Sequence, residues 1–196
     1  WYWLIPFADG TASLGVVGKP ELFDSELSGA DNLWQQVQQE PNLARLLASA
    51  KAVNEVQTLG GYSADVTSLY GERYALLGNA GEFLDPVFSS GVTIALKSAS
   101  LVAPVVDAFL KGQRADFESE FAAPLKQGVE CFKTFVNAWY DRRFQDVIFY
   151  PHQGQDVRRM ISAILAGYAW DDANPHVVQS ERRLDVLAQL CQLEPS

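Results

Sequence analysis

The chain of 196 residues contains few of the residues that most metal-binding chemistries require: two cysteines, two histidines and one methionine. Cys131 and Cys191 lie far apart and form no CxxC pair, so the sequence offers neither zinc-ligand spacing nor a dense disulfide framework. We therefore expect no metal site. Such sparse use of cysteine is typical of a soluble protein in a reducing compartment, and we expect a cytoplasmic location.

Basic residues are also scarce, with 15 lysines and arginines against 24 acidic residues and a formal net charge of −9. No basic run could follow a phosphate backbone, which argues against a nucleic-acid partner. Long uncharged apolar runs are missing as well. The longest apolar stretch, residues 92–110, contains Lys97, Pro104 and Asp107, so we expect no membrane span.

The rest of the composition is ordinary globular chemistry, with 48% hydrophobic, 12% aromatic and 20% charged residues. The length fits one domain or one part of a larger protein. Residues 1–7 read Trp-Tyr-Trp-Leu-Ile-Pro-Phe, and large aromatic side chains in a strand need partners on both faces. We interpret the chain as the C-terminal piece of a longer protein whose other half covers that strand; a processed mature chain is the alternative.

Local patterns predict a mixed fold in the first third of the chain. Residues 1–7 and 11–17 are rich in β-formers, and an Asp-Gly turn between them predicts a hairpin. A helix is predicted over residues 31–50, interrupted near Pro41, and a strand over residues 53–59.

Residues 73–78 form a short apolar run, which predicts a strand buried on both faces as in a parallel sheet. Apolar residues at spacings of three and four follow from Val92, and Gly112 is expected to stop that helix. Helices are further predicted over residues 116–150 with a bend at Pro124, 156–167 and 177–192. The fold class is therefore α+β and helix-dominated.

The loop between the predicted strand at 73–78 and the following helix carries the chemistry. Asn79 offers a donor and an acceptor suited to a polyol hydroxyl, and Pro86 presents a flat, rigid surface. The sequence Ser89-Ser90-Gly91 opens a helix, whose free N–H groups and dipole favour negative charge. A halide would be held by the same donors.

Two motifs give the sequence a family resemblance. Residues 78–92 read Gly-Asn-Ala-Gly-Glu-Phe-Leu-Asp-Pro-Val-Phe-Ser-Ser-Gly-Val, which resembles the second FAD motif of flavin-dependent halogenases, within the hydroxybenzoate-hydroxylase-like flavoproteins. The chain departs from that motif at Gly81, where alanine is usual. Trp1, Trp3, Ile5 and Pro6 match the W-x-W-x-I-P motif that marks halogenases. The resemblance covers residues 1–112 well and the remainder loosely.

The resemblance implies the C-terminal portion of an FAD-binding fold with a helical C-terminal region. Residues 1–72 would be part of a substrate-side sheet with a helix. Residues 73–112 would be the last strand–loop–helix unit of the FAD-binding domain, and residues 113–196 the helical region.

Site roles are likewise implied by the resemblance. Asn79 would contact the ribityl chain, Pro86 would pack near the isoalloxazine, and Ser90 with Gly91 matches the halide-binding dipeptide. Trp1 and Trp3 would separate the flavin from the substrate. The full set of implied cofactor residues is Gly78, Asn79, Ala80, Pro86, Gly91 and Val92, and the tunnel motif is Trp1, Trp3, Ile5 and Pro6.

The implied activity is halogenation of an electron-rich aromatic through a flavin hydroperoxide and a hypohalous species. Phe88 stands where tryptophan halogenases place a catalytic Glu, which favours the phenol and pyrrole branch. The implied partners are FAD, a halide, an aromatic small-molecule or carrier-tethered substrate and a separate NAD(P)H-dependent flavin reductase. The relaying lysine lies in the family's N-terminal half, so the catalytic residue is unknown and this chain alone is expected to bind FAD weakly or not at all.

Two other functional classes remain open. A related FAD-dependent monooxygenase or dehydrogenase would share the fold and the loop. A noncatalytic helical interaction module, for example one that docks a carrier protein, would need no flavin at all.

Several single residues carry plainer expectations. Asp85 is expected to cap the loop, Glu82 to be exposed, and Lys97 to be solvated or to act as a cap. His176 is expected in a loop, as is His152, without the serine or carboxylate arrangement of a catalytic triad. Cys131 lies among apolar helix positions and is expected to be buried.

Overall fold

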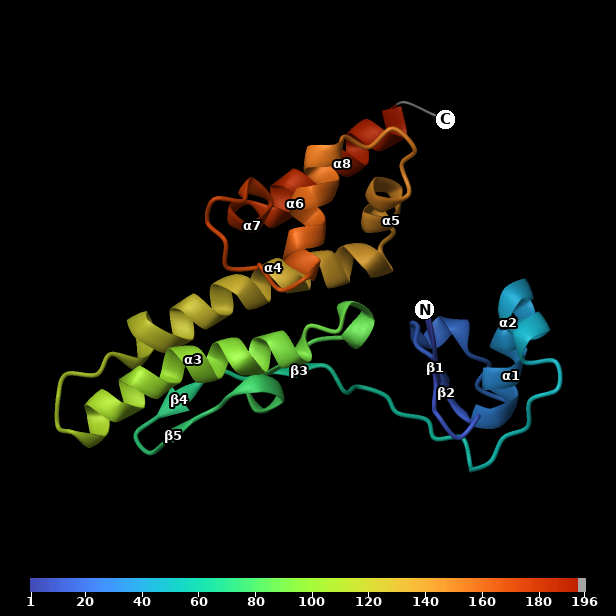
Figure 1. Cartoon of the computed structure of the whole chain (residues 1–196), viewed down its shortest axis with the longest axis horizontal. Helices are drawn as coiled ribbons and strands as arrows, with labels where there is room; N and C mark the ends of the chain where they lie inside the picture. Colours follow the sequence, from blue (N-terminus) through green and yellow to red (C-terminus); the bar gives the residue numbers. More distant parts are fainter. Residues whose placement is uncertain (194–196) are drawn as a thin grey trace. The chain divides into compact units, whose positions relative to one another are not determined.

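The computed structural model describes residues 1–193, and its contacts divide the chain into two compact units, with the boundary between Gly61 and Tyr62. Figure 1 shows the first unit in blue and cyan and the second from teal to red. The sequence-based division at residues 72 and 112 stays a prediction.

The first unit combines one hairpin with two helices. Strand β1 (Tyr2–Pro6) pairs antiparallel with β2 (Ala12–Val16), which confirms the predicted hairpin. A short 3₁₀ turn, η1 (Pro20–Leu22), leads to α1 (Gly29–Gln39) and α2 (Pro41–Leu46). The helical region is broken where expected, because a proline has no N–H and is tolerated only in the first turn of a helix.

The strand predicted over residues 53–59 is wrong. Val53 and Leu59 are each 80% exposed, and the described residues around them form neither helix nor strand. A strand requires a ladder partner for its backbone groups, and the first unit pairs only β1 with β2. Residues 51–61 therefore form an irregular connection.

The second unit begins with two short antiparallel pairs. Strand β3 (Ala64–Asp65) pairs with β6 (Glu82–Phe83), and β4 (Tyr70–Gly71) pairs with β5 (Tyr74–Ala75). All described strand pairs are antiparallel, so the sheet geometry predicted for residues 73–78 is wrong.

The apolar run itself is extended, as predicted, but only its beginning is a strand. Tyr74 is exposed, and Leu77 has φ −120° and ψ 151° before the chain turns. The N–H of Leu76 donates to the carbonyl of Leu69 at 2.8 Å. This run therefore borders the core without being buried on both faces.

Two long helices form the centre of the second unit. Helix α3 (Gly91–Leu110) contacts α4 (Ala123–Tyr140), and the two are drawn in green and yellow in Figure 1. The predicted stop after α3 is confirmed, because Gly112 takes φ +68°. A π-helical turn, η4 (Glu118–Ala122), precedes α4 at the expected bend, and Arg142 with φ +77° ends the helical run.

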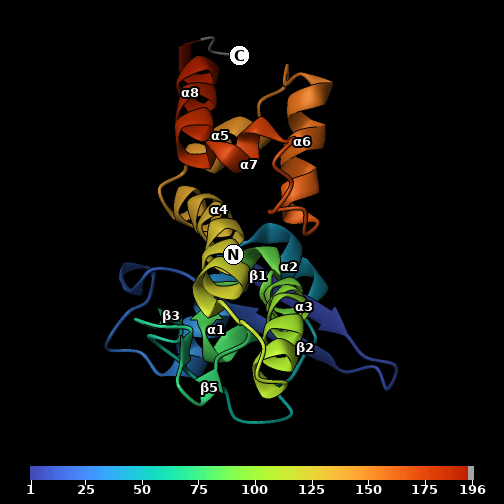
Figure 2. The same cartoon turned by 90° about the vertical axis from the view of Figure 1, so that its left-hand side faces the viewer.

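Three of the four shorter helices that follow α4 pack against it. Helix α4 contacts α5 (Arg143–Ile148), α7 (Pro175–Val178) and α8 (Ser180–Leu193), and α7 also contacts α6 (Gln155–Leu165). Figure 2 shows this group from the side. The helices predicted over residues 156–167 and 177–192 are confirmed within two or three residues.

The core of the second unit is aromatic around α4. Phe121, Phe132, Phe135 and Phe144 are each at most 1% exposed. Cys131 is buried among them, as predicted, and its Sγ lies 4.0 Å from the carbonyl oxygen of His176 in α7. The apolar face of α4 thus holds α5, α7 and α8 in place.

Helix α3 is also long and apolar enough to cross a membrane when judged by length and composition alone. A core helix of a soluble protein passes the same test, and α3 contacts α4 and η4 in the second unit. Lys97 and Asp107 lie within the helix.

Candidate functional site

Gly78 fastens the start of the loop to helix α3. Its N–H donates to the buried Ser98 Oγ at 3.0 Å, and Ser98 in turn donates to the carbonyl of Ala95. Gly78 has φ +53°, and a Cβ placed on it would lie 3.0 Å from the Cβ of Ala95. Glycine is required here because the backbone is left-handed and the helix approaches closely.

This fastening brings Asn79 beside the beginning of α3. A Cβ placed on Gly91 would lie 3.5 Å from the side-chain oxygen of Asn79 and would meet no other atom within 4 Å outside its own helix. The N-cap residue, Ser90, makes no side-chain capping bond. The first-turn N–H groups, including those of Gly91 and Val92, have no partner within the helix.

The arrangement fits the edge of a flavin ring. The helix start offers uncapped donors with a positive dipole end, and the side-chain oxygen of Asn79 lies in front of Gly91. Ser89 takes the left-handed conformation with φ +54°, which turns the chain into the helix. The predicted halide residues, Ser90 and Gly91, both lie at this start.

Pro86 and Phe88 occupy the short 3₁₀ turn η3 (Pro86–Phe88) that leads to the helix. Asp85 caps this turn, because its Oδ1 accepts the N–H of Val87 at 3.0 Å, so the expected capping role is confirmed. Phe88 packs edge-on against Phe144, with ring centroids 5.4 Å apart. The loop is thus anchored to α5 by an aromatic contact.

The carboxylate of Asp85 does more than cap. Its Oδ2 accepts the hydroxyl of Tyr140 at 2.8 Å and that of Tyr62 at 3.1 Å. Burial and the charge of Asp85 raise the pKa of Tyr62 to about 12, so its hydroxyl stays protonated and remains a donor. Neither tyrosine could be assigned to this site from the sequence, because both lie far from Asp85 along the chain.

Glu82 is buried, and the expectation of a solvated side chain is wrong. It is 2% exposed, and its Oε2 makes no hydrogen bond with the described residues. Lys133 of α4 lies 3.6 Å from that oxygen, and its Nζ also meets Asp65 and Glu130, each at 3.1 Å. The strand pair β3–β6 and helix α4 both shield this carboxyl, which loop composition alone did not reveal.

Replacing Glu82 with glutamine should change how stability depends on pH. Burial raises the pKa of Glu82 in the folded protein, so folding favours the protonated carboxyl. That contribution is fully present below the unfolded-state pKa and is lost as the pH rises through the folded-state pKa. Since glutamine does not titrate, E82Q should lose less stability than the parent between acidic and neutral pH.

Urea unfolding at a series of pH values measures this difference. The control is Glu130→Gln, which removes an exposed carboxylate from the same lysine. Parallel pH profiles for E82Q and the parent would show that Glu82 is not shielded as described.

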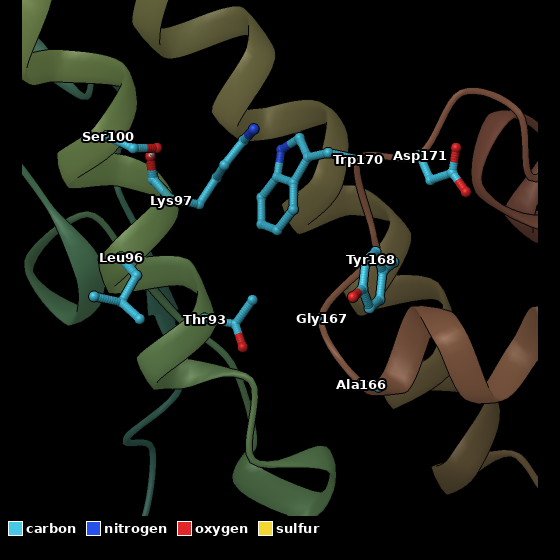
Figure 3. A pocket seen from close by; sticks show the side chains of 9 residues that line it. All are labelled: Thr93, Leu96, Lys97, Ser100, Ala166, Gly167, Tyr168, Trp170 and Asp171. Atoms are coloured by element: carbon cyan, nitrogen blue, oxygen red, sulfur yellow. Dashed lines mark hydrogen bonds between the residues drawn. The ribbon is translucent and has the colours of Figure 1, made fainter.

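A groove of about 600 Å³ lies beside the first half of α3 and is shown in Figure 3. The side chain of Lys97 is half-buried and points at Trp170, with Nζ 5.4 Å from the ring centroid. The ammonium of Lys97 thus contacts the face of an aromatic ring while the side chain stays partly exposed, a contact that the sequence alone did not indicate. The lining residues are Thr93, Leu96, Lys97, Ser100, Ala166, Gly167, Tyr168, Trp170 and Asp171.

This groove begins at the first turn of α3, because Thr93 in its lining is the second residue after Gly91. Two contacts hold Trp170 in place. Its Nε1 donates to the carbonyl of Pro124 at 2.8 Å, and its ring packs over Gly128. The groove is wide open to solvent, and most of its lining surface is apolar, with the Trp170 ring among it.

The tryptophan motif belongs to the first unit, whereas the loop of residues 78–92 and the groove belong to the second. The rings of Trp1 and Trp3 lie 5.8 Å apart at 47°, and Trp3 Nε1 donates to Ser13 Oγ at 3.0 Å. The indole of Trp3 covers Gly15, where a Cβ would come within 2.1 Å of it. Ile5 and Pro6 end the same strand, and both are exposed.

Comparisons with known proteins agree with this fold and loop. No protein-family model matches the chain. A crystal structure of a flavoprotein/dehydrogenase from Cytophaga hutchinsonii is 38% identical with a TM-score of 0.90, covering 98% of this chain and 48% of that one. The flavin-dependent brominase Bmp2 is 24% identical with a TM-score of 0.78, over 99% and 48% of the two chains, which shows the fold alone.

Curated relatives narrow the class. The 1H-pyrrole-2-carbonyl-[peptidyl-carrier protein] chlorinase of Pseudomonas fluorescens is 28% identical over 71% of this chain and 32% of its own length. The flavin-dependent halogenase rdc2 of Metacordyceps chlamydosporia is 32% identical over 70% of this chain and 28% of its own length. The flavin-dependent halogenase armH2 of Armillaria mellea is 29% identical over the whole chain, which spans 42% of that protein.

The structure is thus the C-terminal portion of an FAD-binding flavoprotein fold, with the predicted helix-dominated α+β class. Within that class, the chain is a relative of the flavin-dependent halogenases, as the two motifs indicated. It spans less than half the length of these relatives.

Proposed function

We propose that the protein is an FAD-dependent halogenase acting on an electron-rich aromatic of the phenol or pyrrole type, and that this chain supplies the flavin-edge and halide side of its site. One observation carries the proposal: Asn79 lies beside the uncapped start of α3 at Gly91. The names of the curated relatives, which include a pyrrole chlorinase and flavin-dependent halogenases, support the reaction class.

The residues of this chain would hold the cofactor through backbone donors. The N–H groups of Gly91 and Val92 would meet the pyrimidine edge, Asn79 the ribityl hydroxyls, and Pro86 would pack near the ring. When bound, the flavin would supply the oxidising chemistry. Ser90 and Gly91 would hold the halide, because the helix dipole and its free donors stabilise an anion at this end.

The proposal includes partners that other proteins must provide. A separate NAD(P)H-dependent reductase would deliver reduced flavin, and the substrate would be either free or tethered to a carrier, as the name of the Pseudomonas fluorescens chlorinase states for that protein. A cytoplasmic location suits this supply. The catalytic lysine would come from outside this chain.

The test uses the full-length protein that contains this chain. Supplied with reduced FAD, oxygen and bromide or chloride, it should form a halogenated product from phenols or carrier-tethered pyrroles. Replacing Asn79 with leucine should weaken FAD binding about tenfold, the equivalent of about 1.4 kcal/mol. The matched control is Asn42→Leu in α2, an exposed asparagine of the first unit. A full-length protein that takes up no FAD would overturn the proposal.

A second candidate, an FAD-dependent dehydrogenase or monooxygenase, is favoured by one observation. The Cytophaga hutchinsonii flavoprotein/dehydrogenase matches this chain with a TM-score of 0.90, against 0.78 for the brominase Bmp2. Direct reduction of the bound flavin by NAD(P)H, with turnover that needs no halide, would establish this candidate. Halide-dependent product formation would exclude it.

A further inference from the structure

A second cavity lies among the C-terminal helices, and the loop of residues 78–92 contributes none of its lining. It has a volume of about 450 Å³, within the usual range for small-molecule sites. We call it the arginine pocket. Its lining consists of Val157 of α6, His176 of α7, Gln179, and Arg182, Arg183, Val186 and Leu187 of α8.

The positive charge of this pocket is not neutralised by the residues that the structure describes. The acidic residues nearest to Arg182 and Arg183 on α8 are Glu181 and Asp185, and of these only Asp185, three residues after Arg182, has a helical spacing that lets the side chains meet. Both of these carboxylates instead form ion pairs with Arg143 at the start of α5. Arg182 and Arg183 are both exposed, and neither forms an ion pair with another of residues 1–193, on a protein whose net charge is −9.

His176 adds a buried polar side chain to the same lining. It is 6% exposed, and its ring makes no hydrogen bond with residues 1–193. Its backbone is fixed, since its N–H donates to Asn174 Oδ1 at 3.0 Å and its carbonyl faces the Sγ of Cys131. Burial and the positive charge of Arg183 lower the pKa of His176, as expected where a cation, and not a carboxylate, is the neighbour.

The remaining walls are apolar. Val157, Val186 and Leu187 line the cavity on α6 and α8, so a ligand that entered would meet hydrocarbon on two sides. A guanidinium group binds a carboxylate or phosphate through two parallel N–H bonds, which an inorganic ion and an organic anion can both accept. Only the organic anion would also cover the apolar walls.

We propose that the arginine pocket binds a small organic anion, a carboxylate or phosphate monoester whose charged group meets Arg182 and Arg183 and whose apolar body lies on Val157 and Val186. The polar ring of His176 and the amide of Gln179 give further hydrogen-bonding groups for the anion. This site is independent of flavin and halide, because none of its lining belongs to residues 78–92.

Calorimetric titration of the purified protein tests the proposal, with phenyl phosphate, hexanoate and inorganic phosphate as probes. Both organic anions should bind, and the tighter of the two identifies the head group; inorganic phosphate should bind at least tenfold more weakly. Replacing both arginines (Arg182→Gln with Arg183→Gln) should lower the affinity at least tenfold. The double variant Arg158→Gln with Arg159→Gln on α6 removes the same charge outside the lining and should leave the affinity unchanged.

A second variant tests the shape. Val157→Trp should fill the cavity and abolish binding, while circular dichroism reports that the helices persist. Absence of binding by either organic anion would overturn the proposal. So would an equal loss of affinity in the two double variants, since the binding would then follow net charge and not the pocket.

Discussion

Replacing Phe144 with alanine is expected to lower the free energy of unfolding by about 3–5 kcal/mol, the cost typical of removing a buried phenylalanine. Phe144 is 1% exposed and sits among Phe88, Phe135 and Trp139. Its ring is edge-on to those of Phe88 and Phe135, each at 5.4 Å between centroids, so alanine would leave a cavity and remove both ring contacts. Urea or guanidinium unfolding measures the loss.

The control for this prediction is Phe149→Ala. Phe149 follows the last residue of α5 and is 72% exposed, so the substitution removes an exposed ring. Its effect should stay within about 0.5 kcal/mol. Because Phe88 belongs to the turn that leads to α3, F144A should also weaken FAD binding by the full-length protein. Equal unfolding free energies for the two variants would contradict the aromatic core described for α4 and α5.

The second large effect is expected from Gly78→Ala. A left-handed backbone costs a non-glycine residue about 1–2 kcal/mol, and φ at Gly78 is +53°. The added Cβ would also lie 3.0 Å from the Cβ of Ala95, so the loop must move away from α3 and lengthen its hydrogen bond to Ser98. We expect a total loss of about 2–3 kcal/mol.

The functional consequence of G78A follows from the next residue. If the loop leaves α3, Asn79 no longer lies beside Gly91, and FAD affinity of the full-length protein should fall about tenfold. The matched control is Gly61→Ala, where φ is +63° but no atom lies within 4 Å of the added Cβ. G61A should therefore lose only the free energy that the left-handed backbone costs a non-glycine residue. Identical losses of stability and affinity in both variants would remove any role for the contact with α3.

The sequence allowed the elements with strong local signals to be predicted. The hairpin, α3 and its stop at Gly112, and the helices near the C-terminus follow from period and turn chemistry, which act between near neighbours. The opening of a helix at Gly91 was likewise predictable, because Ser-Ser-Gly after a proline-bearing turn is a local pattern.

The failures all depend on partners distant in the chain. Residues 53–59 are rich enough in β-formers for a strand, but no neighbouring strand pairs with them. Glu82 is buried because β3 and α4 cover it, and His176 lies in α7 over α4 and not in a loop. The ties from Tyr62 and Tyr140 to Asp85 span many residues and leave no periodic signal.

The thiol of Cys131 has a practical consequence. Burial raises its pKa to about 12, and the surrounding helices α4 and α7 leave no path for a reagent. The thiolate is the reactive form, so this cysteine can be alkylated only in molecules whose helices have separated. The rate at which Cys131 takes up a thiol label therefore serves as a clock for the opening of this helical layer, without any introduced probe.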